Sequence, residues 1–107
     1  MSYQKFNSFS DFYKFYLTEH LDPTNRTLHF IGTSIGFCLL IYAVLTFNFI
    51  FILYGVLAGY FFAWLGHFVF EKNKPASFKQ PLYSFIGDWC MWFQLLTGKL
   101  KFNEQKN

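Results

Sequence analysis

The stretch that decides the fold is residues 27–70, TLHFIGTSIGFCLLIYAVLTFNFIFILYGVLAGYFFAWLGHFVF, which contain no lysine, arginine, aspartate or glutamate. Asn48 is the polar break in this stretch. It separates two halves of roughly twenty residues, which is the length that a helix needs to span a bilayer. The sequence therefore predicts helices over 27–47 and 49–71 that run out and back through a membrane, as an antiparallel transmembrane hairpin with Asn48 at the turn.

The composition points to lipid as the solvent. The chain has 107 residues, enough for a single domain over 1–107, and 17 of them are phenylalanine. Charged residues make up 14% of the chain, about half of the share in soluble domains. So short a chain cannot bury this much apolar surface in a water-soluble core. We predict a small all-α polytopic membrane protein, and the scattered basic residues with a net charge of +3 argue against nucleic acid as a partner.

Two shorter helices are expected on either side of the hairpin. The first covers 9–20, with Ser8 as its N-cap and Pro23 beyond its end, and its amphipathic pattern predicts that it lies at the membrane interface. A polar connection over 21–26 follows it. The second covers 82–96 after Pro81, and it is too short to span, so we expect it to be partly inserted. A polar loop over 72–80 precedes it, and a frayed tail follows Gly98.

Small residues recur every four positions in both halves of the hairpin. They are Gly32 and Gly36 in the first half, and Gly55, Gly59 and Ala63 in the second. Such rows let two helix backbones approach closely in lipid. They can pack within the hairpin or between chains, so a homo-oligomer is left open.

Charge and cysteine patterns give the orientation and the redox state. The basic residues Arg26, Lys72, Lys74 and Lys79 lie at one end of the hairpin, and none lies near Asn48. The positive-inside rule places the basic end in the cytoplasm, in either a bacterial inner membrane or the endoplasmic reticulum. The two cysteines, at positions 38 and 90, have neither a disulfide nor a zinc spacing and are expected to be free.

Histidines gather at the same end. His29 and His67 each lie nineteen residues from Asn48, which predicts that they reach the same depth, and His20 lies just before the hairpin. Glu71 shares a helix face with His67. Ionisable groups at a membrane boundary indicate a functional site, and imidazole with carboxylate suits iron, zinc or manganese. For each histidine, a hydrogen-bonded structural role is the alternative.

Three motifs can be read along the chain: His20-x4-Asn25-x3-His29-x2-Gly32, then Gly66-His67-x3-Glu71-x-Asn73-x-Pro75-Ala76, then Pro81-x2-Ser84-x3-Asp88-x2-Met91. Together they resemble the Mpo1-like family over nearly the whole chain. The resemblance implies an Fe(2+)-dependent dioxygenase that uses dioxygen to shorten a 2-hydroxy fatty acid by one carbon. That reaction belongs to lipid α-oxidation in the degradation of the sphingolipid base phytosphingosine.

The resemblance also implies roles for single residues. His20, His29 and His67 would ligate the iron, while Glu71 and Asp88 would be further ligands or would accept hydrogen bonds from ligands. The surrounding sequence adds further candidates for the site. Arg26, Lys72 and Lys74 are cations that can attract the substrate carboxylate, and Asn25 and Asn73 are turn residues that can point into the site. The acyl tail is expected along the aromatic walls of the helices.

Two other functions fit the same residues. Two histidines at equal depth on facing helices can be the axial ligands of one haem. Alternatively, the chain is a non-enzymatic membrane subunit or scaffold, in which the small-residue rows make the contacts and the histidines are structural. Loss of metal in a His67→Ala variant would separate an enzyme from a scaffold.

Overall fold

The computed structural model describes residues 6–74 and 79–103, and this part of the chain is helical without a β-strand. The elements are α1 (Phe9–Thr18), α2 (Pro23–Thr46), α3 (Ile50–Leu65), the π-helix η1 (Gly66–Glu71) and α4 (Pro81–Thr97). The predicted all-α class is confirmed. The motif residues Pro75 and Ala76 and the end of the predicted tail lie outside the described residues.

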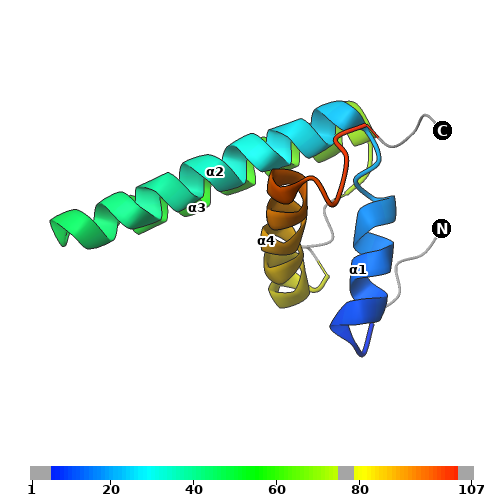
Figure 1. Ribbon diagram of the computed structural model, residues 1–107, viewed down its shortest axis with the longest axis horizontal. Coiled ribbons are helices and arrows are strands. Elements are labelled where there is room, and N and C mark those ends of the chain that lie inside the picture. Colours follow the sequence, from blue (N-terminus) through cyan, green and yellow to red (C-terminus); the bar gives the residue numbers. More distant parts are fainter. Residues whose placement is uncertain (1–5, 75–78, 104–107) are drawn as a thin grey trace.

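Helices α2 and α3 lie side by side and run in opposite directions (Figure 1). A Cβ added to Gly55 would lie 3.1 Å from the carbonyl oxygen of Gly36, and one added to Gly32 would lie 2.9 Å from the Cβ of Phe62. The small-residue rows therefore bring two helices of the same chain together. The turn between them includes Phe47, whose φ of 54° lies in the left-handed region.

Both long helices have the length and composition of membrane spans. α2 has 24 residues and α3 with η1 has 22, and the rise of about 1.5 Å per residue makes each longer than the ~30 Å hydrocarbon core. Only 17% of the most apolar stretch of each is buried inside the protein. Near the turn, Leu45 and Phe47 are 73% and 82% exposed. Two helices of this chain could therefore cross a membrane.

Helix α4 packs against α2, and α1 packs against α4. Both lie steeply across the α2–α3 pair at the end away from the turn, while the half near the turn extends beyond them (Figure 1). The buried apolar side chains between α1 and α4 include Phe12 and Tyr16 on α1, and Met91 and Leu95 on α4. This core joins the two short helices, so residues that are distant in sequence surround one end of the long pair.

The start of α2 was wrongly predicted. The segment 21–26 was expected to be a connection, but α2 begins at Pro23, with Asp22 as its N-cap accepting a hydrogen bond from the backbone N–H of Asn25. Proline suits the first turn of a helix, because the N–H that it lacks would have no partner there. Pro23 thus opens α2, and α1 already ends at Thr18. The consequence is that Asn25 and Arg26 are helical residues.

Other boundaries follow the predictions more closely. Ser8 caps α1 by accepting from the backbone N–H of Asp11, and Pro81 occupies the first turn of α4. Gly98 ends α4 with a φ of 81°, a conformation that glycine adopts without strain. The predicted helix over 49–71 is one continuous rod, but its last turn is a π-helix. Single π-helical turns occur frequently at functional sites.

Candidate metal centre

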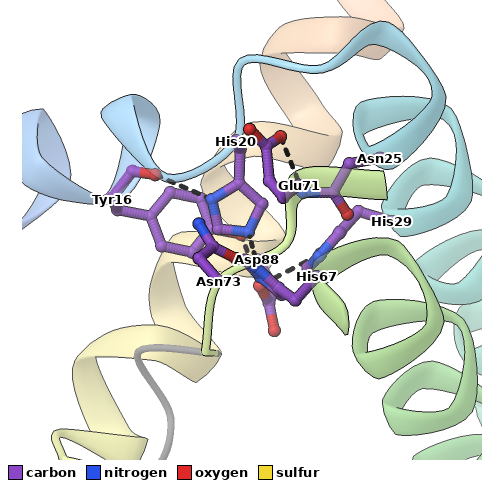
Figure 2. Close-up of polar contacts among 8 residues, drawn as sticks. All are labelled: Tyr16, His20, Asn25, His29, His67, Glu71, Asn73 and Asp88. Atoms are coloured by element: carbon purple, nitrogen blue, oxygen red, sulfur yellow. Dashed lines mark hydrogen bonds and ion pairs between the residues drawn. The ribbon is translucent and has the colours of Figure 1, made fainter. Parts of the chain in front are cut away.

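Three histidines from three separate elements converge at the end of the long helix pair (Figure 2). His20 follows α1, His29 lies in α2 and His67 lies in η1. One ligand nitrogen from each lies within 4.8 Å of the other two, and their side chains are at most 5% exposed. The ring centroids of His29 and His67 are 5.1 Å apart, so these two residues lie next to each other at the same end of the helix pair.

Asn73 determines which nitrogen of His67 carries the proton. Its side-chain Nδ2 donates to the backbone carbonyl and the carboxylate of Glu19, which can only accept. Its Oδ1 therefore faces His67 Nδ1, at 2.7 Å, and accepts from it. The proton of neutral His67 thus sits on Nδ1, and the lone pair of Nε2 points into the cluster.

The backbone of Tyr16 likewise determines which nitrogen of His20 carries the proton. Its backbone carbonyl oxygen lies 2.7 Å from His20 Nδ1 and can only accept, so Nδ1 carries the proton. The two rings also stack, with centroids 4.0 Å apart. Burial, and then the neighbouring His29 and His67, lower the pKa of His20 well below its ordinary value. His20 is therefore neutral, which is the form of imidazole that ligates a metal.

The Nε2 atoms of His20 and His67 lie 2.9 Å apart. Since both protons are on Nδ1, two lone pairs face each other and neither ring can donate to the other. A cation bound by both nitrogens removes this repulsion. Two imidazole nitrogens bound about 2.1 Å from one ion, at right angles, lie roughly 3 Å apart. The spacing of these two nitrogens therefore suits two adjacent positions around one metal.

His29 completes the cluster from α2. Its Nδ1 lies 3.6 Å from a carboxylate oxygen of Asp88 on α4, and the Tyr16 hydroxyl donates a hydrogen bond to the same oxygen. Its Nε2 is buried and has no hydrogen-bond partner among residues 6–74 and 79–103. A buried nitrogen without a partner is costly unless a ligand occupies it. The three imidazoles therefore fit a first-row metal ion such as iron or zinc.

The two candidate carboxylates, Asp88 and Glu71, make different contacts around the histidine cluster. Asp88 contacts His29 and Tyr16, so it lies beside the cluster, and its role as an acceptor for a histidine N–H stays a prediction. Neither acid belongs to the group of ligand atoms within 4.8 Å of one another. Glu71 instead accepts from the backbone N–H of Asp22, at 2.7 Å, and from Asn25 Nδ2, at 3.1 Å. It thereby ties the end of η1 to the start of α2 (Figure 2).

Asn25 lies against the backbone of Gly66, immediately before His67. A Cβ added to Gly66 would lie 1.9 Å from the Oδ1 of Asn25. Only glycine leaves room for this contact, and the contact places η1 next to the first turn of α2. Asn25 therefore shapes the site by fixing where His67 meets His29, while Asn73 shapes it by holding the His67 ring.

Arg26 requires a correction, because it was expected to attract the substrate carboxylate. Its side chain is only 1% exposed. Its guanidinium donates to the carbonyl oxygens of His20, at 2.5 Å, and Lys101, at 2.6 Å. These bonds fasten the segment that carries His20 to the segment that follows α4. We therefore assign Arg26 a positioning role, and only Lys72 and Lys74, which are exposed beyond η1, remain candidates for the carboxylate.

An apolar groove begins at the cluster. It has a volume of about 200 Å³ and runs between α2, α3 and α4. His29 and Asp88 line it at the cluster, and Leu40 and Ile52 line it towards the turn. The groove reaches the cluster at His29 and is lined by apolar side chains along most of its length.

Tyr16 is the site residue that sequence reasoning missed. It lies four residues before His20, within the helix predicted over 9–20. The spacing of four residues was the available signal, because it places the carbonyl of one residue beneath the side chain of the other. Burial and the neighbouring Asp88 raise the pKa of the Tyr16 hydroxyl well above its ordinary value. The hydroxyl is therefore a permanent donor to Asp88.

Comparisons with known proteins agree with these motifs. A family model described as "Mpo1-like: 2-hydroxy-palmitic acid dioxygenase Mpo1-like" matches residues 6–100, which include every residue of the site. No curated protein and no solved structure matches the chain.

Proposed function

The chain belongs to the Mpo1-like family, and we propose that it is an Fe(II)-dependent dioxygenase that shortens 2-hydroxy fatty acids by one carbon. One observation carries the proposal beyond the family. Three buried imidazoles each bring a ring nitrogen within 4.8 Å of the other two, and the Nε2 atoms of His20 and His67 are only 2.9 Å apart. Three histidines occupy three positions around a metal and leave others for substrate.

The proposed reaction balances with dioxygen alone as the oxidant. The bond between C1 and C2 of the 2-hydroxy acid breaks, C1 leaves as carbon dioxide, and C2 becomes the carboxyl carbon of the shorter acid. One water molecule accounts for the remaining oxygen and two hydrogens. When bound, Fe(II) supplies a redox centre for dioxygen and a Lewis acid for the 2-hydroxy carboxylate.

The chain's own residues prepare this chemistry. Asn73 and the carbonyl of Tyr16 keep protons on the outer nitrogens of His67 and His20, so the inner nitrogens are free to bind. Asp88 supports His29 through its Nδ1. Burial of the three rings keeps bulk water away, which strengthens electrostatic interactions within the site. Lys72 and Lys74, exposed beside η1, would attract the anionic head group.

We further propose that α2 and α3 cross a bilayer as a hairpin, with the histidine end in the cytoplasm. The low burial of the two apolar helices supports the crossing, and the basic residues at the histidine end support the orientation. α1 and α4, which lie across the long pair, would then lie near the interface (Figure 1). A site at this boundary suits a substrate whose head is hydrated and whose tail is in lipid. Degradation of phytosphingosine in the endoplasmic reticulum, or a related bacterial pathway at the inner membrane, would supply such acids.

Metal content and turnover test the proposal. The protein is purified without a His-tag in mild detergent under anaerobic conditions and supplied with Fe(II). We expect about one iron per chain, by mass spectrometry, and loss of most of it in His67→Ala. Val69→Ala is the matched control, since Val69 lies on the same π-helix and is 50% exposed. The iron form should consume dioxygen with 2-hydroxypalmitic acid and release the acid with one carbon fewer.

Two outcomes would contradict the proposal. If neither the parent nor the control binds metal after Fe(II) is supplied, the ligand assignment fails and a scaffold becomes the better interpretation. If the protein binds zinc tightly and the iron form gives no turnover, the site is a metal centre of another kind. A strong Soret band would indicate haem, but the ring centroids of His29 and His67 are too close to admit a porphyrin between them.

A further inference from the structure

The groove that begins at the histidines matches an acyl chain in length. Its lining on α2 extends from His29 to Leu40, and its lining on α3 extends from Ala63 to Ile52. Each pair is eleven residues apart, so both walls are about 16 Å long. This is close to half of the ~30 Å hydrocarbon core of a bilayer, which is the depth that the acyl chains of one leaflet fill.

At the end of the groove next to the cluster lies a buried nitrogen without a hydrogen-bond partner in the described part of the chain, the Nε2 of His29. His29 lines the groove and is 5% exposed. From that point towards the turn, the groove walls include Val56 on α3 and Trp89 on α4. A ligand with a polar, metal-binding head and an unbranched apolar tail fits this order of surfaces.

Gly59 leaves free space on the wall of the groove. It lines the groove, and a Cβ added there would meet no heavy atom of residues 6–74 and 79–103 within 4 Å. Gly55, one turn away, differs, because a Cβ there would lie 3.1 Å from the Gly36 oxygen. Gly55 is therefore needed for helix packing. Helix packing does not require glycine at position 59, because the space for a Cβ there is empty. A side chain at this position would instead enter the groove.

We infer that this groove binds the acyl tail of the substrate, with the carboxylate end at the histidines, and that Gly59 determines whether a long tail fits. The inference rests on the proposed function for the identity of the head group. The tail site itself depends only on the groove and can be tested without turnover.

Photolabelling in phosphatidylcholine nanodiscs tests the tail site. The probe is 2-hydroxypalmitic acid with a diazirine in the middle of its chain, and labelled residues are identified by peptide mass spectrometry. We expect labelling of Val56 and Trp89 that excess unlabelled 2-hydroxypalmitic acid abolishes. Labelling of Leu45, which is 73% exposed near the turn, should not respond to the competitor. Equal responses of groove and control residues would overturn the inference.

Substitutions in the groove give the second readout. Gly59→Leu should lower probe binding about tenfold, because it displaces roughly two methylenes of buried tail, and it should leave bound metal unchanged. Val56→Phe and Leu57→Phe form a matched pair of neighbours on α3, and only Val56 lines the groove. Val56→Phe should weaken the probe and Leu57→Phe should not. This pair keeps the test valid if Gly59→Leu does not fold.

The two proposals can fail separately. Saturable labelling of the groove without iron binding or turnover would retain the tail site and reject the dioxygenase. Turnover of 2-hydroxypalmitic acid with a KM that Gly59→Leu and Val56→Phe leave unchanged would retain the enzyme and reject the tail site.

Discussion

The Nε2 atoms of His20 and His67 face each other at 2.9 Å, although 47 positions separate the two residues in the chain. Each ring keeps its proton on the opposite nitrogen, where Tyr16 and Asn73 supply oxygens that only accept. The pair therefore stores a repulsion that a bound cation relieves. Substitutions of the residues that hold the outer nitrogens of these histidines should therefore change metal binding, as substitutions of the histidines themselves should.

Asn73→Ala should weaken metal binding without removing a ligand. The variant leaves His67 Nδ1 without its acceptor, so the ring can turn or shift its proton to Nε2. Loss of such a supporting hydrogen bond typically lowers metal affinity by about 10–100-fold. Competition with a chelator of known affinity measures the effect. Asn48→Ala, at the distant turn, is the control, and an equal loss in both variants would count against the role of Asn73.

Tyr16→Phe separates two functions of one residue. The variant keeps the backbone carbonyl and the stacked ring but removes the hydroxyl that donates to Asp88. Leaving that carboxylate oxygen without its donor should cost about 1–3 kcal/mol of stability, measured by thermal unfolding in detergent. Tyr54→Phe, at a 49% exposed position, should change stability little. Metal content should survive in both, and its loss in Tyr16→Phe would show that the hydroxyl acts on the ligands.

Gly66→Ala should destabilise the protein, because its Cβ would lie 1.9 Å from Asn25 Oδ1. Overpacking of this kind costs about 1–3 kcal/mol. Gly59→Ala adds the same methyl group in open space on α3 and should be neutral or slightly stabilising. Combining Gly66→Ala with Asn25→Ala should recover part of the loss, as a double-mutant cycle would measure. Strict additivity would contradict the contact.

Arg26→Met should lower stability more than it lowers substrate affinity. It leaves the carbonyl oxygens of His20 and Lys101 without the guanidinium that donates to them, and each such loss costs about 1–3 kcal/mol. Arg26→Lys should rescue little, because a single ammonium lacks the planar fork that reaches two acceptors. Lys79→Met, at an exposed position, is the control. A normal melting temperature with a raised KM in Arg26→Met would instead support contact with the carboxylate.

The helices were predictable because their signals are local. Uncharged runs, the Ser8 cap, Pro81 and Gly98 act within a few residues, and they gave most boundaries to within a few positions. Pro23 misled the prediction because proline ends one helix and begins another with the same geometry. The π-helical turn at His67 was not predictable, since no local sequence pattern distinguishes it from an α-helical turn.

The sequence by itself determined that two apolar helices end near three histidines, since equal spacing about Asn48 sets equal depth. Spacing along a helix follows from a fixed rise per residue, so it can be read without coordinates. Only the tertiary structure decided which groups contact the outer ring nitrogens of the histidines. Tyr16, Asp88 and Asn73 reach the cluster from separate elements, and Arg26 is buried by the segment after α4. Those contacts join residues far apart in the chain, and no local pattern specifies them.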